Sequence, residues 1–190
     1  MRTFLQLSGW FYRQATGRIV LFFLALQIAF NVLVFPNLQA RMGGDTQANP
    51  LDLRFGFTAE EAYAYLDSLG AEGRDVYQWT EQVADGVYPI VYTLLLIFLI
   101  TYFFKKVFAE GSLWRRFNLL PFLVMLADFL ENIGIVTMLN HFPEQAEGAA
   151  QLAATANLLK WSFFPIMIIL VLIGLGGVIY YKVSNRKILA

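Results

Sequence analysis

The segment Leu119–Leu139 reads LLPFLVMLADFLENIGIVTML and combines two properties that seldom occur together. It is long and apolar enough for one transmembrane helix, which needs about 20 mostly apolar residues. It also holds Asp128, Glu131 and Asn132, whose spacing of three and four residues puts them on one helical face. Ionisable groups are costly in lipid, so this face should turn towards protein. The segment therefore predicts a membrane helix bundle with a polar interior.

Three further apolar segments complete this bundle. They are IVLFFLALQIAFNVLVF (19–35), GVYPIVYTLLLIFLITYFF (86–104) and WSFFPIMIILVLIGLGGVIYY (161–181). Together with 119–139 they predict four transmembrane helices in a single all-α integral membrane domain spanning residues 1–190. We interpret 19–35 as a span rather than a cleaved signal peptide, because its apolar run exceeds a typical signal core and its lead-in is long.

The composition excludes several classes of protein. The chain is 58% hydrophobic and only 15% charged, whereas a soluble domain is about a quarter charged. Fourteen basic and fourteen acidic residues leave no net charge, so no nucleic-acid partner is expected. The chain has no cysteine and one histidine, His141, so we expect no metal and no cofactor. A carboxylate-only Mg²⁺ or Ca²⁺ site around Asp128 and Glu131 is possible, but no motif supports it.

The distribution of charge predicts the orientation. With four spans, one side of the membrane carries the residues before 19–35, those between 86–104 and 119–139, and those after 161–181. This side holds ten Lys and Arg residues, and the opposite side holds three. By the positive-inside rule, both termini should be cytoplasmic. The ten are Arg2, Arg13, Arg18, Lys105, Lys106, Arg115, Arg116, Lys182, Arg186 and Lys187, and the three are Arg41, Arg54 and Arg74.

Two segments are expected outside the bilayer. Residues 1–17 mix aromatic and basic side chains, which is typical of a helix at the cytoplasmic interface. Residues 36–85 should form an extracytoplasmic helical loop that caps the outer face. Its first third, 37–50, is predicted to be irregular, Thr58 and Glu61 have the spacing of a capping box, Gly70 should end that helix, and a second helix should cover 72–83.

Every predicted span carries polar groups in its middle or outer half. Asn31, Tyr92 and Glu131 each lie 13 residues from the cytoplasmic end of their helix, roughly 20 Å up at about 1.5 Å per residue. The inner third offers only Thr101 and Tyr102. This pattern predicts an outward-opening polar pocket beneath the long loop. Its candidate residues are Gln27, Asn31, Tyr88, Tyr92, Asp128, Glu131, Asn132 and Lys160.

Three interpretations of these residues remain open. They could form a hydrogen-bonded network that fixes helix register, in which Asp128 and Glu131 share a proton or are compensated by Lys160. They could bind a lipid-like or other amphiphilic small molecule, or belong to an accessory subunit of a membrane complex. They could exchange protons in an intramembrane enzyme or proton-coupled carrier. Gly174–Gly177 favours close helix packing, within the chain or in a homo-oligomer.

The stretch DLRFGFTAEEAYAYLDSLGAEGRDVY (52–77), the YPIVY of the second span, DFLEN in the third and LLKW before the fourth also carry a resemblance. Over about 52–161 the chain resembles a group of small bacterial four-span membrane proteins. The resemblance implies a location in the bacterial inner membrane and transfers no functional residue. The loop lengths are similar to those of claudins, but the cysteine pair of the claudin signature is absent.

Overall fold

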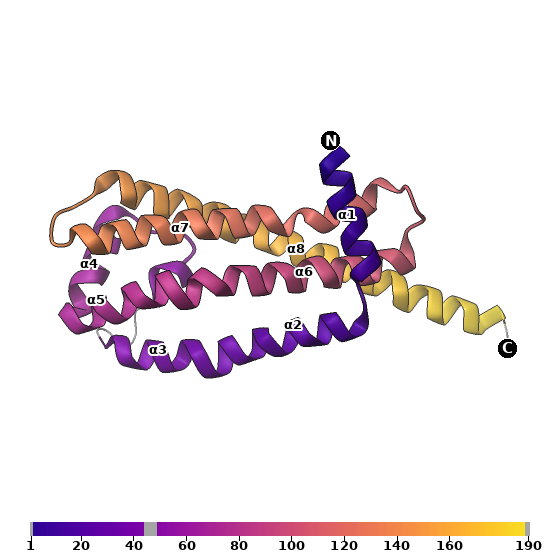
Figure 1. The fold of residues 1–190 in the computed structure, drawn as a ribbon, viewed down its shortest axis with the longest axis horizontal. Coiled ribbons are helices and arrows are strands. Elements are labelled where there is room, and N and C mark those ends of the chain that lie inside the picture. Colours follow the sequence, from indigo (N-terminus) through magenta and orange to yellow (C-terminus); the bar gives the residue numbers. More distant parts are fainter. Residues whose placement is uncertain (1, 44–48, 189–190) are drawn as a thin grey trace.

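The structure is a computed structural model that describes residues 2–43 and 49–188, and over these residues the chain is entirely helical (Figure 1). Its elements are α1 (Arg2–Gln14), α2 (Gly17–Ala29), η1 (Phe30–Val34), α3 (Phe35–Met42), η2 (Leu51–Leu53), α4 (Ala59–Ser68), α5 (Gly70–Trp79), η3 (Thr80–Ala84), α6 (Asp85–Val107), η4 (Leu113–Leu119), α7 (Pro121–His141) and α8 (Glu147–Ile188). Both η1 and η3 are π-helical turns that join the α-helices on either side of them.

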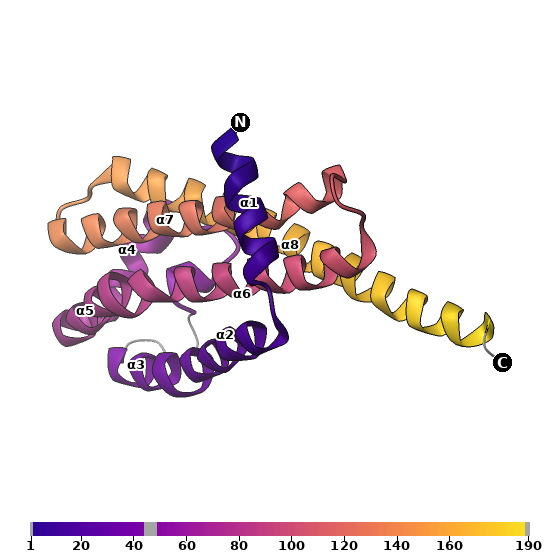
Figure 2. The same cartoon turned by 45° about the vertical axis from the view of Figure 1, so that its right-hand side comes forward.

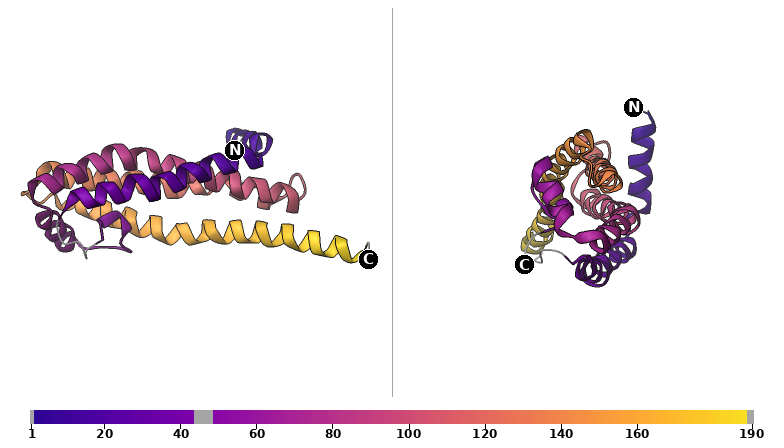
Figure 3. Two further views of the ribbon diagram at one scale, coloured as in Figure 1. Left: turned by 90° about the horizontal axis from the view of Figure 1, so that it is seen from below. Right: turned by 90° about the vertical axis from the view of Figure 1, so that its left-hand side faces the viewer.

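Four helical stretches are long and apolar enough to cross a bilayer: Gly17–Met42, Gly70–Val107, Leu113–His141 and Glu147–Ser184. Each contains one of the four predicted spans, so the prediction of four long apolar helices is confirmed. They lie side by side along the long axis of the molecule (Figures 1 and 3). Helix α6 contacts α2, α7 and α8, and α7 packs most extensively on α8.

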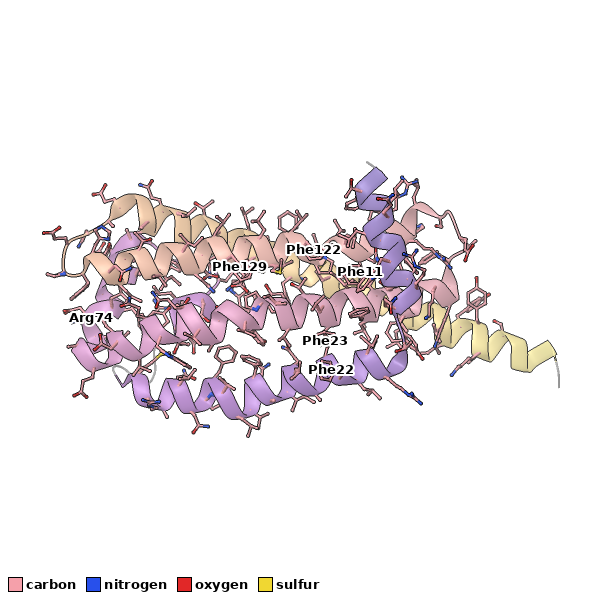
Figure 4. The ribbon with its side chains drawn as sticks, viewed as in Figure 1. Phe11, Phe22, Phe23, Arg74, Phe122 and Phe129 are labelled. Carbon is pink, nitrogen blue, oxygen red and sulfur yellow. The ribbon has the colours of Figure 1, made fainter. Side chains whose placement is uncertain are left out.

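The two ends of the bundle differ in their covering elements. Helix α1 runs across the long axis at the end where α6 finishes and α7 begins (Figures 1 and 3). Its Phe11 is buried, with its ring centroid 5.3 Å from that of Phe98 and 6.3 Å from that of Phe122 (Figure 4). We call this the basic end, after the side chains described below, and the opposite end, which carries α4 and α5, the acidic end.

Helix α4 has the predicted start and stop. The Thr58 hydroxyl accepts a hydrogen bond from the Glu61 N–H (3.1 Å), and the Glu61 carboxylate accepts one from the Thr58 N–H (2.7 Å). Gly70 follows the helix at a φ of 66°, a conformation that costs glycine little. The buried face of α4, which includes Tyr63 and Leu66, packs in a hydrophobic cluster with residues of α7 and α8 such as Met138.

Three helix boundaries differ from the prediction. Residues 37–42 were expected to be irregular, but the first long helix continues through Pro36 to Met42, with the π-helical turn η1 directly before α3. Residues 44–48 of the same segment lie outside the described residues. Helix α5 runs through η3 into α6 without a break, and α8 begins at Glu147 rather than near Trp161.

Glycines allow the long helices to approach closely. A Cβ on Gly134 would lie 2.7 Å from the Cβ of Ala153, and one on Gly174 would lie 2.7 Å from the Cβ of Phe103. Gly177 meets Val107 in the same way, whereas Gly176 has nothing within 4 Å. The predicted close packing at Gly174–Gly177 is confirmed within the chain at Gly174 and Gly177, and a homo-oligomer stays a prediction.

Candidate functional site

A buried ammonium group lies at the centre of the acidic end. Lys160 Nζ of α8 is 3.1 Å from Asp128 Oδ1 and also forms an ion pair with Glu131 Oε2, both of α7. Tyr92 of α6 donates from its hydroxyl to Asp128 Oδ2 (2.8 Å), and Asn157 Nδ2 donates to Glu131 Oε1 (2.7 Å). Every oxygen of the two carboxylates therefore has a partner, and of the two predicted ways to relieve their repulsion, compensation by Lys160 is the one observed.

The same part of α8 fastens the segment between α3 and α4 to the bundle. Asn157 Oδ1 accepts a hydrogen bond from the Gly56 N–H (2.6 Å), and its Nδ2 donates to the Leu51 carbonyl (3.3 Å). The Asp52 carbonyl accepts from Lys160 Nζ (3.1 Å) and from the Trp161 indole N–H (3.0 Å). This fastened segment, 51–56, forms one wall of a cavity.

The cavity has a volume of about 230 Å³ and lies between segment 51–56, the α3 end of the first long helix and η3. Both π-helical turns reach it, η1 through Asn31 and η3 through Thr80 and Glu81. Turns of this kind are frequent at functional sites, because they rotate side chains out of the α-helical register. Its wall is apolar at Phe35, Pro36, Met42, Pro50 and Leu53, and aromatic at Tyr77 and Tyr88.

Three carboxylates line this cavity. Oxygen atoms of Asp52, Glu81 and Asp85 all lie within 4.8 Å of one another, and Glu81 and Asp85 are only 2% and 5% exposed. The Tyr77 hydroxyl and Glu81 Oε2 are buried without a hydrogen-bond partner among the described residues. Burial raises the pKa of the Asp52 carboxyl above its usual value, and the Lys160 ammonium opposes that rise. A set of oxygen ligands at these separations is suited to a small cation.

The eight predicted site residues divide between two places. Asn31 and Tyr88 line the cavity, where the Tyr88 hydroxyl accepts hydrogen bonds from Gln27 Nε2 (2.6 Å) and Asn31 Nδ2 (3.2 Å). The other six do not line it: Gln27, Tyr92, Asp128, Glu131, Asn132 and Lys160. Asn132 Nδ2 donates to the Asp85 carbonyl (3.0 Å), and Tyr92, Asp128, Glu131 and Lys160 form the network described above. Tyr92, Asp128, Glu131 and Lys160 thus contact one another inside the bundle, whereas Gln27 Oε1 and Asn132 Oδ1 are buried without a hydrogen-bond partner among the described residues.

The acidic lining was missed from the sequence. Tyr77, Glu81, Asp85 and Tyr88 are spaced by four, four and three residues, which puts them on one face of a helix that runs through all of them. The sequence predicts separate helices over 72–83 and 86–104, whereas in the structure α5, η3 and α6 are continuous and bring the four residues together. Asp52 joins the acidic lining only through contacts of its segment with α8, so the sequence around Asp52 does not indicate its place in the cavity.

A smaller neutral network lies at the basic end. Ser8 of α1 donates to Asn118 Oδ1 (2.8 Å), and Asn118 Nδ2 donates to the Thr101 hydroxyl (3.0 Å); all three side chains are buried. Thr101 is one of the two polar residues that the sequence places in the inner third of the spans, whereas Ser8 and Asn118 were not predicted.

Comparison of the chain with protein-family models, with curated proteins and with solved structures finds no match.

Proposed function

We propose that the protein is a multi-pass integral membrane protein that binds a small, positively charged amphiphile in the cavity at its acidic end. The observation that carries this proposal is the pairing of three carboxylates with apolar walls in one cavity. The carboxylates would hold the cationic head group, and side chains such as Phe35 and Leu53 would contact its alkyl part. About 230 Å³ is below the range of drug-sized pockets, so it suits a head group rather than a whole lipid.

The orientation forms part of the proposal. With the positive-inside rule applied to the basic end, both termini face the cytoplasm of a bacterial cell and the cavity faces outward. The chain lacks cysteine, so single cysteines at Asp67 and Ser112 can be labelled in intact cells with a membrane-impermeant maleimide. We expect labelling at position 67 and none at 112; labelling of both from one side would contradict the orientation.

Binding can be tested with a charged probe and its neutral counterpart. Native mass spectrometry in mild detergent should show one decylamine per chain and no retention of decanol, because only the amine is cationic. The variant E81Q/D85N should lose decylamine, while D67N/E72Q, which removes two exposed acids, should keep it. Equal retention by the two variants, or equal retention of decanol, would show that the carboxylates do not select the ligand.

A divalent cation is the second candidate ligand, because the three carboxylates can converge on one ion and the buried Tyr77 hydroxyl beside them has no hydrogen-bond partner among the residues that the structure describes. Isothermal titration with Ca²⁺ and with Mg²⁺ after treatment with EDTA tests this candidate directly. Saturable binding of the metal that is abolished in E81Q/D85N, with no binding of decylamine, would favour the ion over the amphiphile.

The proton-transfer alternative places the chemistry at Asp128 and Glu131 instead. The full set of partners on both carboxylates supports a structural role for this pair. E131Q keeps the shape of the side chain and removes its charge. If the cavity binds its ligand unchanged in E131Q, ligand binding does not need the Glu131 charge. The ligand-binding proposal then stands without the proton-exchange alternative.

A further inference from the structure

The basic end contains a second cavity, at a site where no ligand was expected from the sequence. It has a volume of about 770 Å³ and lies between α1 and the connection from α6 to η4. It is open on one side and separate from the cavity at the acidic end, with which it shares no lining residue.

Five of the lining side chains are basic and one is acidic. They are Arg13, Lys105, Lys106, Arg115, Arg116 and Glu110. In the part of the chain that the structure describes, no ion pair joins any of the five to a carboxylate. A cavity with this excess of unpaired positive charge attracts an anion, and the guanidinium groups favour one with several oxygens, such as a phosphate.

Two of the basic groups are held in place by the protein itself. Arg115 donates from Nε to the Phe108 carbonyl (2.9 Å) and from Nη2 to the Lys105 carbonyl (3.3 Å), and its guanidinium carbon lies 4.9 Å from the centre of the Tyr12 ring. Lys105 Nζ donates to the Ala15 carbonyl. Arg13, Lys106 and Arg116 are exposed at the rim. The cavity thus has two basic side chains held by hydrogen bonds to the backbone and three accessible ones at its rim.

The surroundings of the cavity match a membrane surface. Helix α1 runs across the bundle (Figure 2) and exposes Phe4, Leu7 and Trp10, which are 48%, 41% and 44% accessible. A short helix with exposed aromatic and apolar side chains beside basic ones lies in the headgroup layer. Leu5, also of α1 and 39% exposed, lines the cavity itself and would meet the glycerol and upper acyl carbons of a bound lipid.

We propose that this cavity binds the phosphate group of an anionic phospholipid. The excess of positive charge favours an anionic over a zwitterionic headgroup, and the apolar face of α1 favours a lipid over a free anion. This site is independent of the ligand proposed for the acidic end.

The test uses the full chain and a matched pair of variants. R13Q/R116Q removes two charges from the rim, whereas R18Q/K182Q removes two exposed basic residues that do not line the cavity. Each protein is titrated in mild detergent with phosphatidylglycerol, with phosphatidylcholine and with inorganic phosphate, and the bound species are counted by native mass spectrometry. Circular dichroism checks that the helical content is unchanged.

We expect phosphatidylglycerol to bind wild type and R18Q/K182Q in preference to phosphatidylcholine. R13Q/R116Q should bind it about twenty-five-fold more weakly, since each basic residue near an anionic lipid contributes about fivefold. Equal affinity in the two variants, or equal binding of both lipids, would overturn the proposal. Binding of inorganic phosphate as tightly as phosphatidylglycerol would also overturn it, because the site would then serve a soluble anion.

Discussion

The acidic and basic ends use charge in opposite ways. At the acidic end, five carboxylates, those of Asp52, Glu81, Asp85, Asp128 and Glu131, lie near a single ammonium, that of Lys160, and all but Asp52 are buried. At the basic end the charges line an open cavity, and the buried polar groups, such as Asn118, are neutral. Charge therefore joins helices at one end and faces the surroundings at the other. The same kind of substitution should have very different consequences at the two ends.

The largest effect is expected from Lys160→Met. It leaves Asp128 and Glu131 buried without their counter-charge, and breaking a buried ion pair in this way costs about 3–5 kcal/mol. The free energy of unfolding in bicelles measures the loss. Lys182→Met, which removes an exposed ammonium, should change it little. Neutralising the acids as well, in K160M/D128N/E131Q, should recover much of the stability; no recovery would mean that packing of the lysine stem, and not charge, is responsible.

A smaller effect is expected from Gly134→Ala. The new methyl group would lie 2.7 Å from the Cβ of Ala153 and 2.8 Å from the Ala149 carbonyl oxygen, so α7 and α8 must separate. Overpacking of this kind costs about 1–3 kcal/mol. Gly176→Ala adds the same group where nothing lies within 4 Å and is the control. Melting temperatures of the two variants should differ clearly, and equal values would show that the α7–α8 contact adjusts freely.

At the basic end, Asn118→Ala should cost about 1 kcal/mol. It removes the acceptor for Ser8 and the donor to Thr101, and hydrogen bonds between membrane helices each contribute about that much or less. The same unfolding assay as for Lys160→Met compares the two ends directly. A loss as large as that of Lys160→Met would remove the distinction between a charged and a neutral network.

The smallest effect concerns pH. Burial raises the pKa of Asp52, so the folded chain keeps a proton that the unfolded chain releases above about pH 3.9. The contribution of this group to stability is therefore most favourable below that pH and falls as the pH rises towards the folded pKa. Asp52→Asn should flatten this fall and be more stable than wild type at pH 7, whereas Asp67→Asn, at an exposed position, should follow wild type. If the stability of Asp52→Asn falls with pH as steeply as that of wild type, other groups cause the pH dependence.

The sequence was sufficient for the long helices and for part of the acidic end. Hydropathy predicted the four apolar helices, and the spacing of Asp128 and Glu131 placed both on the face that meets Lys160. Local chemistry also predicted the start and end of α4, because Thr58, Glu61 and Gly70 act through neighbouring backbone atoms.

The cavity could not be predicted in the same way. Asp52 reaches it because Asn157, Lys160 and Trp161, more than a hundred residues later in the chain, bind the backbone of segment 51–56. Periodicity carries no information on such contacts. The two π-helical turns could not be predicted either, since the sequence around Asn31 and Glu81 is compatible with an ordinary α-helix.

The close packing of α7 on α8 has a consequence for how the chain enters a membrane. The two helices are separated only by residues 142–146, and Lys160 lies opposite Asp128 and Glu131. During synthesis α7 alone would present two carboxylates to lipid, at a cost of several kcal/mol. An antiparallel hairpin that inserts in one step carries those charges already matched. For the membrane protein proposed above, insertion of α7 and α8 as a pair would therefore avoid exposing unmatched charges to lipid.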